Sequence, residues 1–369
     1  MKNAFYAQSG GVTAVINASA CGVIETARKH KSKIGKVYAG RNGIIGALTE
    51  DLIDTSKDSA AAIAALRHTP SGAFGSCRYK LKGIEEHRAQ YERLIEVFKA
   101  HNIGYFFYNG GGDSADTCLK VSQISEKMGY PIIAVHVPKT VDNDLPITDN
   151  CPGFGSVAKY IAVSTLEATF DVASMAKTST KVFVLEVMGR HAGWIALYGG
   201  VGGSADIILL PEIPFTMKRV AEVINQRDAH GHHSTLIVVA EGAHLETGAL
   251  VTREKSGSQG EDRLGGIGER IAKLAQELTG KEARECTLGH LQRGGPPTSL
   301  DRILALRFGV KAVQIIQDGK FGRMVSYQQY QVGDVSIEDA VSKLRLVEKN
   351  NELVLAARSV GISFGDENE

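Results

Sequence analysis

Residues 104–114 read GYFFYNGGGDS, and this stretch indicates the fold class. A short apolar run, Gly104 to Tyr108, ends in a glycine-rich turn, and a helical pattern follows. Strand, tight turn and helix in this order are typical of an α/β protein built around mostly parallel sheets. Glycine lets the backbone approach an anion closely, and the N-terminus of the next helix presents free N–H groups, so such a turn suits a phosphate.

The same unit recurs along the chain. Glycine turns also occur at Ser9–Gly11 (SGG) and Val187–Gly193 (VMGRHAG), each before a helical pattern. The other expected strands are Ala4–Gln8, Lys36–Ala39, Pro131–Val135, Val182–Glu186, Ile207–Leu210 and Leu236–Val239. Four apolar residues at helical spacing predict a helix packed against a sheet: Tyr91, Leu94, Ile95 and Phe98. None of the glycine turns fits GxxxxGK[ST] or a complete GxGxxG, which excludes the ordinary P-loop and dinucleotide fingerprints.

Two further segments carry weaker patterns. Residues 252–266 lose their apolar positions and fill with glycine, serine and charges, which predicts a surface loop. After Gly322 the sequence SIEDAVSKLRLVEKNNELVLAARSVG is expected to form helices, and the final GDENE to fray.

Length and composition limit the class of protein. A chain of 369 residues is long enough for two or three domains. The 42 basic and 41 acidic residues give a net charge of +1, which removes any whole-chain argument for binding nucleic acid or an anionic membrane. Without a long apolar segment or a signal-peptide core, we expect a cytoplasmic protein. Five scattered cysteines without a CxxC pair predict neither disulfides nor structural zinc.

The loop Pro138–Asp144 (PKTVDND) carries a lysine, a hydroxyl group and two carboxylates in seven residues. In a tight turn, one aspartate could accept a hydroxyl proton while the other binds or orients a cation. The alternative is an Asx turn at Asn143 and Asp144, with Lys139 neutralising the carboxylates at the surface. The residues of the loop alone leave both interpretations open.

Four motifs in order, GGGDS (110–114), PKTVDND (138–144), EVMGRHAGW (186–194) and LGHLQRGG (288–295), resemble the phosphofructokinase family. The resemblance extends from Ser9 to about Arg302. It implies phosphoryl transfer to the 1-hydroxyl of fructose 6-phosphate with Mg²⁺, on two Rossmann-like three-layer α/β domains with mostly parallel sheets. Residues 1–154 with about 292–345 would bind the phosphoryl donor. Residues from about 155 to 291, with 346–369, would bind the sugar phosphate.

The resemblance also implies a role for individual residues. Asp142 matches the general base and Asp144 its supporting acid, with Lys139 and Thr140 as further catalytic residues. The residues expected to bind pyrophosphate are Gly10, Gly11, Arg78, Lys80, Asp113 and Lys139, and Asp113 is also the expected metal ligand. The residues expected to bind the sugar phosphate are Thr140, Lys181, Met188, Gly189, Arg190, Glu241, Arg284, His290 and Arg293.

Two positions indicate the phosphoryl donor. Members of the family that use ATP commonly have glycine where this chain has Asp113 and Lys139. A carboxylate and a lysine there would fill the space of a nucleotide's α-phosphate, and Lys139 could neutralise a leaving phosphate. We therefore expect pyrophosphate as the donor. Many members also carry Asp or Asn at Gly112, and SGGxAPGxN where this chain reads SGGVTAVIN.

Expectations about assembly and regulation follow from the same resemblance. Lys181 and Arg284 match cations that reach the sugar phosphate from a neighbouring subunit, which predicts a homodimer or homotetramer with shared sites. A reversible reaction with little allosteric regulation is expected. The alternatives are an ATP-dependent enzyme with the same acceptor, a broader kinase that accepts sedoheptulose 7-phosphate, and a sugar-phosphate sensor without catalysis. A dinucleotide oxidoreductase ranks last.

Overall fold

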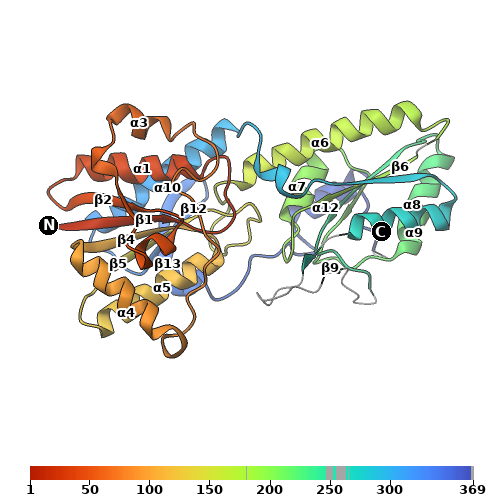
Figure 1. Cartoon of the computed structure of the whole chain (residues 1–369). Helices are drawn as coiled ribbons and strands as arrows, with labels where there is room; N and C mark the ends of the chain where they lie inside the picture. Colours follow the sequence, from red (N-terminus) through yellow and green to blue (C-terminus); the bar gives the residue numbers. More distant parts are fainter. Residues whose placement is uncertain (180, 247–251, 255–262, 265, 367–369) are drawn as a thin grey trace. The chain divides into compact units, whose positions relative to one another are not determined.

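Figure 1 shows the computed structural model of the chain, which describes residues 1–179, 181–246, 252–254, 263–264 and 266–366. The chain forms two compact units, each assembled from three separate segments. Unit 1 consists of Met1–Val141, Leu145–Ser156 and Pro296–Leu344. Unit 2 consists of Asp142–Asp144, Val157–Gly295 and Arg345–Glu369. The short segment Asp142–Asp144 thus belongs to unit 2, although unit 1 residues flank it on both sides.

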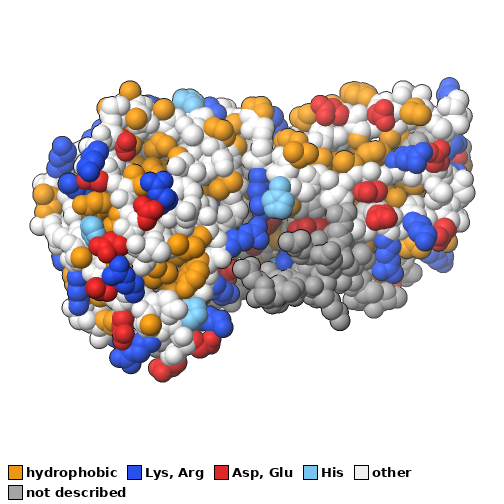
Figure 2. All heavy atoms as spheres, viewed as in Figure 1, with side chains coloured by type: hydrophobic (Ala, Val, Ile, Leu, Met, Phe, Trp, Pro, Cys, Tyr) orange, Lys and Arg blue, Asp and Glu red, His pale blue; other side chains and the backbone are white. Residues whose placement is uncertain are grey.

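Charged side chains of both signs cover the surface. On the face of unit 1 that Figure 2 shows, basic and acidic side chains are interspersed, in keeping with the net charge of +1. Of the helices in the described ranges, none combines the length and the apolar character needed to cross a lipid bilayer.

The sheet of unit 1 has seven strands in its described residues, in the order β13-β12-β5-β4-β1-β2-β3. They are β1 (Lys2–Gln8), β2 (Ile34–Gly40), β3 (Leu52–Asp54), β4 (Ile103–Gly110), β5 (Ile133–Pro138), β12 (Arg323–Gln328) and β13 (Gln331–Ser336). The five central strands are parallel, and β3 and β13 add antiparallel edges. The carboxyl ends of β1, β4 and β5 therefore meet at one edge of the sheet.

Helices cover both faces of this sheet. They are α1 (Ile16–Lys29), α2 (Ile44–Leu48), η1 (Thr55–Lys57), α3 (Ala60–Ala65), α4 (Ile84–Ala100), α5 (Gly112–Lys127), α10 (Ser299–Gln317) and α11 (Ile337–Ala340). Side chains along β1 alternate between the faces. Ala4 and Tyr6 share a core with α1 and α10, whereas Phe5 and Ala7 share one with α4 and α5. Unit 1 is therefore a three-layer α/β structure.

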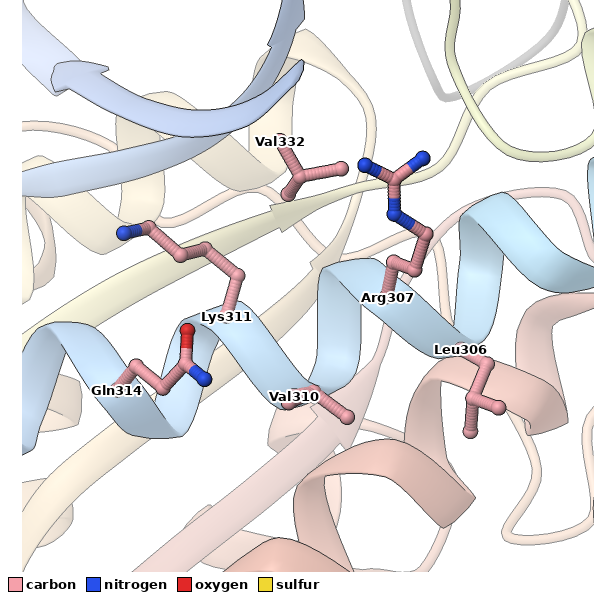
Figure 3. Close-up of a pocket in the computed structure, with 6 residues that line it drawn as sticks. All are labelled: Leu306, Arg307, Val310, Lys311, Gln314 and Val332. Carbon is pink, nitrogen blue, oxygen red and sulfur yellow. The ribbon is translucent and has the colours of Figure 1, made fainter. Parts of the chain in front are cut away.

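The helix α10 also lines a cavity of about 310 Å³ on unit 1 (Figure 3). Its lining consists of Leu306, Arg307, Val310, Lys311 and Gln314 from α10 and Val332 from β13. None of the site residues expected from the sequence is among them.

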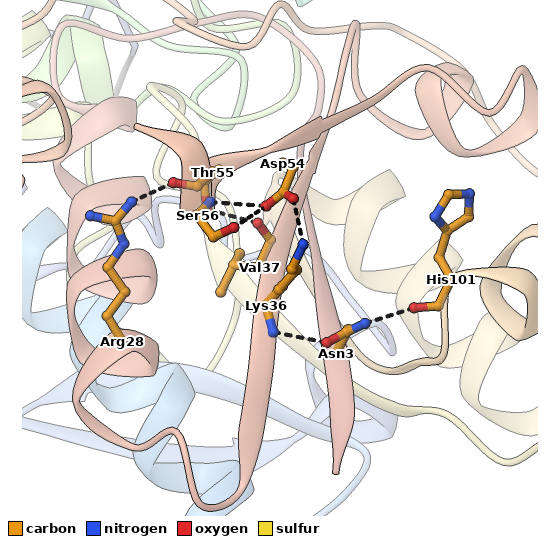
Figure 4. A network of polar contacts seen from close by, with 8 residues as sticks. All are labelled: Asn3, Arg28, Lys36, Val37, Asp54, Thr55, Ser56 and His101. Atoms are coloured by element: carbon orange, nitrogen blue, oxygen red, sulfur yellow. Dashed lines mark hydrogen bonds and ion pairs between the residues drawn. The ribbon is translucent and has the colours of Figure 1, made fainter. Parts of the chain in front are cut away.

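A polar network fixes the edge of the sheet formed by β2 and β3 (Figure 4). The carboxylate of Asp54 accepts hydrogen bonds from the backbone N–H of Ser56 and from the ammonium group of Lys36, which lies 2.8 Å away. Asn3 joins β1 to the network, because its side chain accepts from the Lys36 N–H and donates to the His101 carbonyl. These bonds hold the edge opposite β13 in register.

Unit 2 contains a four-stranded parallel sheet in the order β11-β6-β8-β7. Its strands are β6 (Val182–Val187), β7 (Ile207–Leu209), β8 (Thr235–Ala240) and β11 (Ala283–Thr287), and β9 (Thr252–Glu254) and β10 (Arg263–Leu264) form a separate antiparallel pair. The helices are α6 (Phe154–Met175, starting in unit 1), α7 (Trp194–Gly202), α8 (Met217–Ala229), α9 (Ile267–Thr279), η2 (Gly289–Arg293) and α12 (Glu352–Ser359). Ile207 and Leu209 pack in a core with α8 and α9, and α7 packs against β7 and β8 near Ile208. Helices thus lie on both faces of this sheet as well.

Most of the expected elements are confirmed. Every predicted strand overlaps a strand of the structure, and the four apolar residues expected on a helix are buried on α4. The strands β12 and β13 were missed, since Arg323–Ser336 lacks an apolar run. The helices expected after Ser336 are present as α11 and α12.

Two expectations need correction or lie partly outside the described residues. The expected fraying of the C-terminal GDENE is wrong at Asp366, because its carboxylate is buried and pairs with Arg358 at 2.9 Å. Residues 367–369 lie outside the described ranges. In the predicted surface loop 252–266, the ends are the paired strands β9 and β10, and residues 255–262 and 265 lie outside the described ranges.

Candidate active site

The glycine turns of unit 1 gather at one edge of its sheet. Ser9–Gly11 follows β1, Gly111–Asp113 follows β4, and Lys139–Thr140 follows β5, and these three strands are parallel neighbours. Ligands of α/β proteins bind at this edge, beyond the carboxyl ends of the strands. The residues expected to bind the phosphoryl donor therefore lie where the fold offers a site.

The side chain of Lys139 lies against the first turn. It is only 3% exposed, and its ammonium group donates a hydrogen bond to the Gly11 carbonyl at 2.6 Å. A Cβ atom built on Gly10 would lie 3.5 Å from the same nitrogen, and Gly10 has a φ of +75°, which favours glycine. The structure thus brings Gly10, Gly11 and Lys139 together.

The first turn also holds the segment that leads to Arg78. The Gly10 N–H donates to the Cys77 carbonyl at 2.9 Å, and the Ser76 hydroxyl donates to the Gly10 carbonyl at 2.7 Å. Arg78 follows directly, with an exposed side chain. The backbone that leads to Arg78 is therefore bonded to the first turn, and the Arg78 side chain is accessible to solvent.

Lys80 and Asp113 form an exposed ion pair with an N···O distance of 2.7 Å. Their side chains are 61% and 71% exposed, so both charges are accessible to a ligand. Asp113 lies in the first turn of α5, and the N-cap residue of this helix, Gly111, supplies no side-chain cap. A Cβ atom at Gly112 would meet only Leu145, at 3.9 Å, so there is open space beside the helix N-terminus.

A buried histidine supports the second glycine turn. The Nε2–H of His136 donates to the Gly110 carbonyl at 3.0 Å, and the Lys139 N–H donates to the same oxygen at 2.9 Å. Complete burial lowers the pKa of His136 to about 3, and the charge of Lys139 adds to the effect. This histidine is therefore neutral near pH 7. Sequence analysis missed it, although a histidine inside the apolar run PIIAVHV is a visible signal.

Protonation of His136 is expected to contribute to acid unfolding. The folded-state pKa lies below the ordinary 6.5, so this stability is complete above pH 6.5 and is lost as the pH falls towards 3. The loss amounts to about 1.4 kcal/mol per pH unit for one proton.

Between pH 7 and pH 5, the free energy of unfolding in urea should fall more steeply for the wild type than for His136→Gln. The control His68→Gln, at an exposed position, should keep the wild-type slope. Equal slopes for His136→Gln and the wild type would contradict a buried neutral histidine.

The acidic loop leaves unit 1 after Thr140 and Val141. Thr140 is buried, and it pairs with Gly153 in a parallel bridge. The next residues form a turn in which Asn143 is buried with a left-handed φ of +54°. Asp142 and Asp144, on either side of it, are half-buried. This turn leaves the two carboxylates partly accessible. It is compatible with both the Asx-turn alternative and the catalytic interpretation.

A second set of expected site residues gathers at the carboxyl edge of the sheet in unit 2. Met188–Arg190 follows β6, Glu241 follows β8, and η2, which follows β11, carries His290 and Arg293. The Met188 N–H donates to the side chain of Gln292 at 3.1 Å, so the first of these turns is bonded to η2. A Cβ atom at Gly242 would lie 2.0 Å from the Arg190 carbonyl, so the backbones of two turns touch there.

Charges converge on Glu241. Burial raises the pKa of this carboxyl group, and the nearby Glu186 raises it further, whereas Arg190 and Arg293 oppose the shift. Glu186 itself is buried and accepts hydrogen bonds from the N–H groups of Gly266 and Gly268 at 3.0 and 2.9 Å, at the start of α9. Sequence analysis assigned no role to Glu186, although EVMGRHAGW contains it. The structure thus groups a carboxyl group and two guanidinium groups at one edge.

Lys181 and Arg284 lie at the opposite edge of this sheet. Lys181 directly precedes β6 and Met188 directly follows it, so the two are about 23 Å apart along the strand. Arg284 is near the start of β11 and pairs with Glu282. Lys181 pairs with Asp228 at 3.3 Å, and His233 and Lys281 contact the same carboxylate, which keeps the pKa of Asp228 well below its usual range. Within one chain, these two cations do not join the other sugar-phosphate residues.

Among the described residues, no group of three or more histidine, cysteine, aspartate or glutamate side chains is arranged to hold a metal ion. Asp113 offers one accessible carboxylate for such an ion.

Comparison with known proteins identifies the family of this chain. The family model for phosphofructokinase matches residues 3–316, and the chain belongs to the phosphofructokinase family. A pyrophosphate--fructose 6-phosphate 1-phosphotransferase from Methylococcus capsulatus is 59% identical over 355 residues, covering 94% of this chain and 78% of that protein. One from Halomonas elongata is 60% identical over 336 residues, covering 87% of this chain and 78% of that protein.

A solved structure is similar over nearly the whole chain. The pyrophosphate-dependent phosphofructokinase from Nitrosospira multiformis superposes with a TM-score of 0.85 and 51% identity, covering 99% of this chain and 93% of that one. The expected family and its α/β fold with mostly parallel sheets are thus confirmed.

Proposed function

We propose that this protein transfers a phosphoryl group from pyrophosphate to the 1-hydroxyl of fructose 6-phosphate, giving fructose 1,6-bisphosphate and phosphate, as a glycolytic or gluconeogenic enzyme of the cytoplasm. The observation that carries the proposal is the ammonium group of Lys139, buried against the Gly11 carbonyl at the carboxyl edge of the sheet in unit 1. A lysine fixed there neutralises a leaving phosphate as a point charge. The names of the relatives from M. capsulatus and H. elongata support the same activity.

The donor site suits a small polyanion better than a nucleotide. Lys139, Lys80 and Arg78 supply positive charge close to the two glycine turns. The ion pair between Lys80 and Asp113 stands at the start of α5, beside the open N-terminus. In ATP-dependent members of the family, we expect the α-phosphate at this position, so the pair disfavours ATP by crowding and by the charge of the carboxylate.

The donor site offers one exposed carboxylate for the proposed magnesium ion. Mg²⁺ usually binds through one or two carboxylates together with substrate phosphates, and the exposed carboxylate of Asp113 meets that requirement. Asp113 would hold the ion against pyrophosphate. The ion would neutralise charge on the phosphate oxygens during transfer.

In the transfer step, the 1-hydroxyl oxygen attacks one phosphorus atom of pyrophosphate and the bridging P–O bond breaks. Asp142 accepts the hydroxyl proton, and Asp144 supports it. The bridging oxygen keeps the electron pair and leaves as part of phosphate, whose charge Lys139 stabilises. Thr140 and the backbone of Gly10 and Gly11 position the phosphoryl group. Phosphoryl transfer needs little covalent assistance, so positioning and charge neutralisation carry most of the catalysis.

Unit 2 is the proposed sugar-phosphate site and unit 1 the proposed donor site. Arg293 and His290 on η2 are the proposed donors to the sugar's phosphate. Glu241 accepts a hydrogen bond from a sugar hydroxyl when its carboxyl group is ionised, and Arg190 beside it favours that form. The turn Met188–Gly189 shapes the site through its backbone.

The sugar phosphate is proposed to be shared between subunits of a homodimer or homotetramer. Lys181 and Arg284 lie at the far edge of the sheet, which supports their supply by a second copy of the chain. An exposed apolar row on α6 supports association: Val163, Leu166 and Phe170 recur at helical spacing and are 45%, 44% and 66% exposed. Figure 2 shows hydrophobic side chains along this helix.

Complementation tests the shared site. Arg284→Ala and Arg293→Ala should each raise the KM for fructose 6-phosphate by about 10-fold or more, because each removes a charge-assisted bond to phosphate. When these two weakly binding variants are mixed and reassociated, some sites should contain both arginines and regain normal affinity. Arg307→Ala, a change at an exposed position on α10 of unit 1, serves as the control. A mixture no better than its components would contradict the sharing of Arg284.

Product analysis tests the function as a whole. With fructose 6-phosphate and Mg²⁺, turnover with pyrophosphate should exceed turnover with ATP, and phosphate with fructose 1,6-bisphosphate should give the reverse reaction. Kinetics should be hyperbolic, with little response to ADP or phosphoenolpyruvate. Faster turnover with ATP would overturn the donor assignment. No turnover with either donor, despite binding of fructose 6-phosphate, would favour the sensor.

A further inference from the structure

Arg345, in the C-terminal segment of unit 2, contacts the acidic loop directly. Its backbone N–H donates to the Asp144 carbonyl at 2.8 Å, and its guanidinium group donates to the Asn143 carbonyl at 3.4 Å. These carbonyls lie inside the loop that carries Asp142 and Asp144. None of the four motifs contains Arg345, which lies beyond residue 316, where the match to the family model ends.

The other side of Arg345 is fixed to the start of α7. The indole N–H of Trp194 donates to the Arg345 carbonyl at 2.9 Å, and the guanidinium carbon lies 4.2 Å from the centre of the indole ring. This geometry is that of a cation–π contact, which restricts the arginine side chain to one orientation. Trp194 is buried, so it is a rigid support.

A second bond fixes the same segment two residues later. The Val347 N–H donates to the carboxylate of Glu212 at 2.8 Å, and this carboxylate also accepts from the Gly193 N–H at 2.9 Å. Glu212 thus connects the C-terminal segment to the residue before Trp194. Arg345 is therefore held at two points and bonded to the acidic loop at a third.

The loop needs such support because its backbone is strained. A left-handed conformation at a non-glycine residue such as Asn143 costs about 1 kcal/mol or more and persists only when surrounding contacts enforce it. Fixing the carbonyls of Asn143 and Asp144 fixes the directions in which the neighbouring carboxylates project. A misplacement of about 1 Å at a reacting group lowers turnover by about 10²-fold.

We propose that Arg345 is a positioning residue for the acidic loop, holding Asp142 and Asp144 in the orientation required for proton acceptance from the acceptor hydroxyl. This role rests on the proposed function. It assigns to the C-terminal segment a task in the reaction, which it performs through the backbone of the loop and without contact to a substrate.

The kinetic test compares three variants with the wild type in the full chain. Arg345→Met should lower kcat by about 10- to 100-fold and leave the KM for fructose 6-phosphate and for pyrophosphate within about twofold, because only the orientation of the base changes. Arg345→Lys, which keeps the charge over the indole ring, should recover part of the loss. Trp194→Phe should show a smaller loss of kcat, since it removes the indole N–H but keeps an aromatic ring.

Arg358→Met is the matched control. Arg358 also belongs to the C-terminal segment, pairs with Asp366 at 2.9 Å and lies 4.8 Å from the ring of Phe364. Its loss should lower the melting temperature and leave kcat unchanged. If Arg345→Met does not fold, the graded losses of kcat expected for Arg345→Lys and Trp194→Phe carry the test.

Hydrogen exchange gives a readout that does not depend on turnover. Peptides covering residues 141–147 should exchange faster in Arg345→Met than in the wild type, and peptides from α4 should not change. Turnover of the wild type with pyrophosphate tests the proposed function. The comparison of each variant with the wild type tests the role of Arg345 separately. Unchanged kcat and unchanged exchange in Arg345→Met, or a rise in KM alone, would overturn the positioning role even in an active enzyme.

Discussion

Replacing Asp142 with asparagine is expected to lower kcat by about 10² to 10⁴, the usual contribution of a positioned general base. Asparagine keeps the shape of the side chain but cannot accept the hydroxyl proton. The KM for fructose 6-phosphate should change little, because the sugar is bound by other residues. Steady-state kinetics with pyrophosphate and Mg²⁺ measure both quantities.

The control for this change is Asp318→Asn, an exposed carboxylate at the end of α10. It should keep wild-type kinetics. The Asp142→Asn protein should also keep the wild-type melting temperature. Near-normal turnover in Asp142→Asn, or loss of the fold, would return Asp142 to the role of a residue that stabilises the turn.

Replacing Lys139 with methionine is expected to lower kcat/KM for pyrophosphate by about 10²- to 10³-fold. Enzymes lose about this much when one preorganised group that stabilises developing charge is removed. The ammonium group is buried against the Gly11 carbonyl, so its removal takes away both the charge on the leaving phosphate and a bond that fixes the first turn. Lys127→Met, at an exposed position near the end of α5, should have no such effect. Comparable kinetics for the two variants would contradict the role of Lys139.

The double variant Lys139→Gly/Asp113→Gly tests donor choice at the same site. It should use pyrophosphate poorly, and its ratio of ATP turnover to pyrophosphate turnover should rise, because space for an α-phosphate is restored while a cation for the leaving group is lost. An unchanged ratio would indicate that other residues select the donor.

Much of the fold could be predicted because its signals are local. Short apolar runs followed by glycine turns marked β1, β4 and β6, an apolar run alone marked β5, and the buried face of α4 followed from helical spacing. The strands β12 and β13 gave no such signal, because polar and charged residues interrupt both of them and β13 lies at the edge of the sheet.

The packing of α10 against α1 could not be predicted, because it depends on contacts far apart in the chain. A Cβ atom at Gly309 would lie 2.1 Å from the Ser19 carbonyl, so these helices approach each other at backbone distance. The sequence shows only a glycine in each helix.

The residues of the candidate site likewise fall into those that the sequence could predict and those that only the structure shows. Contiguous motifs indicated Lys139, Asp142, Met188 and Arg293, and their roles remain proposals. His136 and Arg345 stand outside those motifs, and their contacts with Gly110 and with the acidic loop exist only after the chain has folded. Residues that support a loop from a distant part of the chain form no motif with it, so the sequence alone does not identify them.

The interleaving of the two units has a consequence for synthesis on the ribosome. Helix α10 and the strands β12 and β13 of unit 1 come from Pro296–Leu344, so the segments Met1–Val141 and Leu145–Ser156 emerge long before these three elements exist. At about 5–20 residues per second, the wait lasts roughly 10 s or more. During that time, the apolar face later covered by α10 is exposed on the nascent chain. This protein should therefore require chaperone protection at an intermediate length, and a gene cut between the two units should yield no soluble fragment.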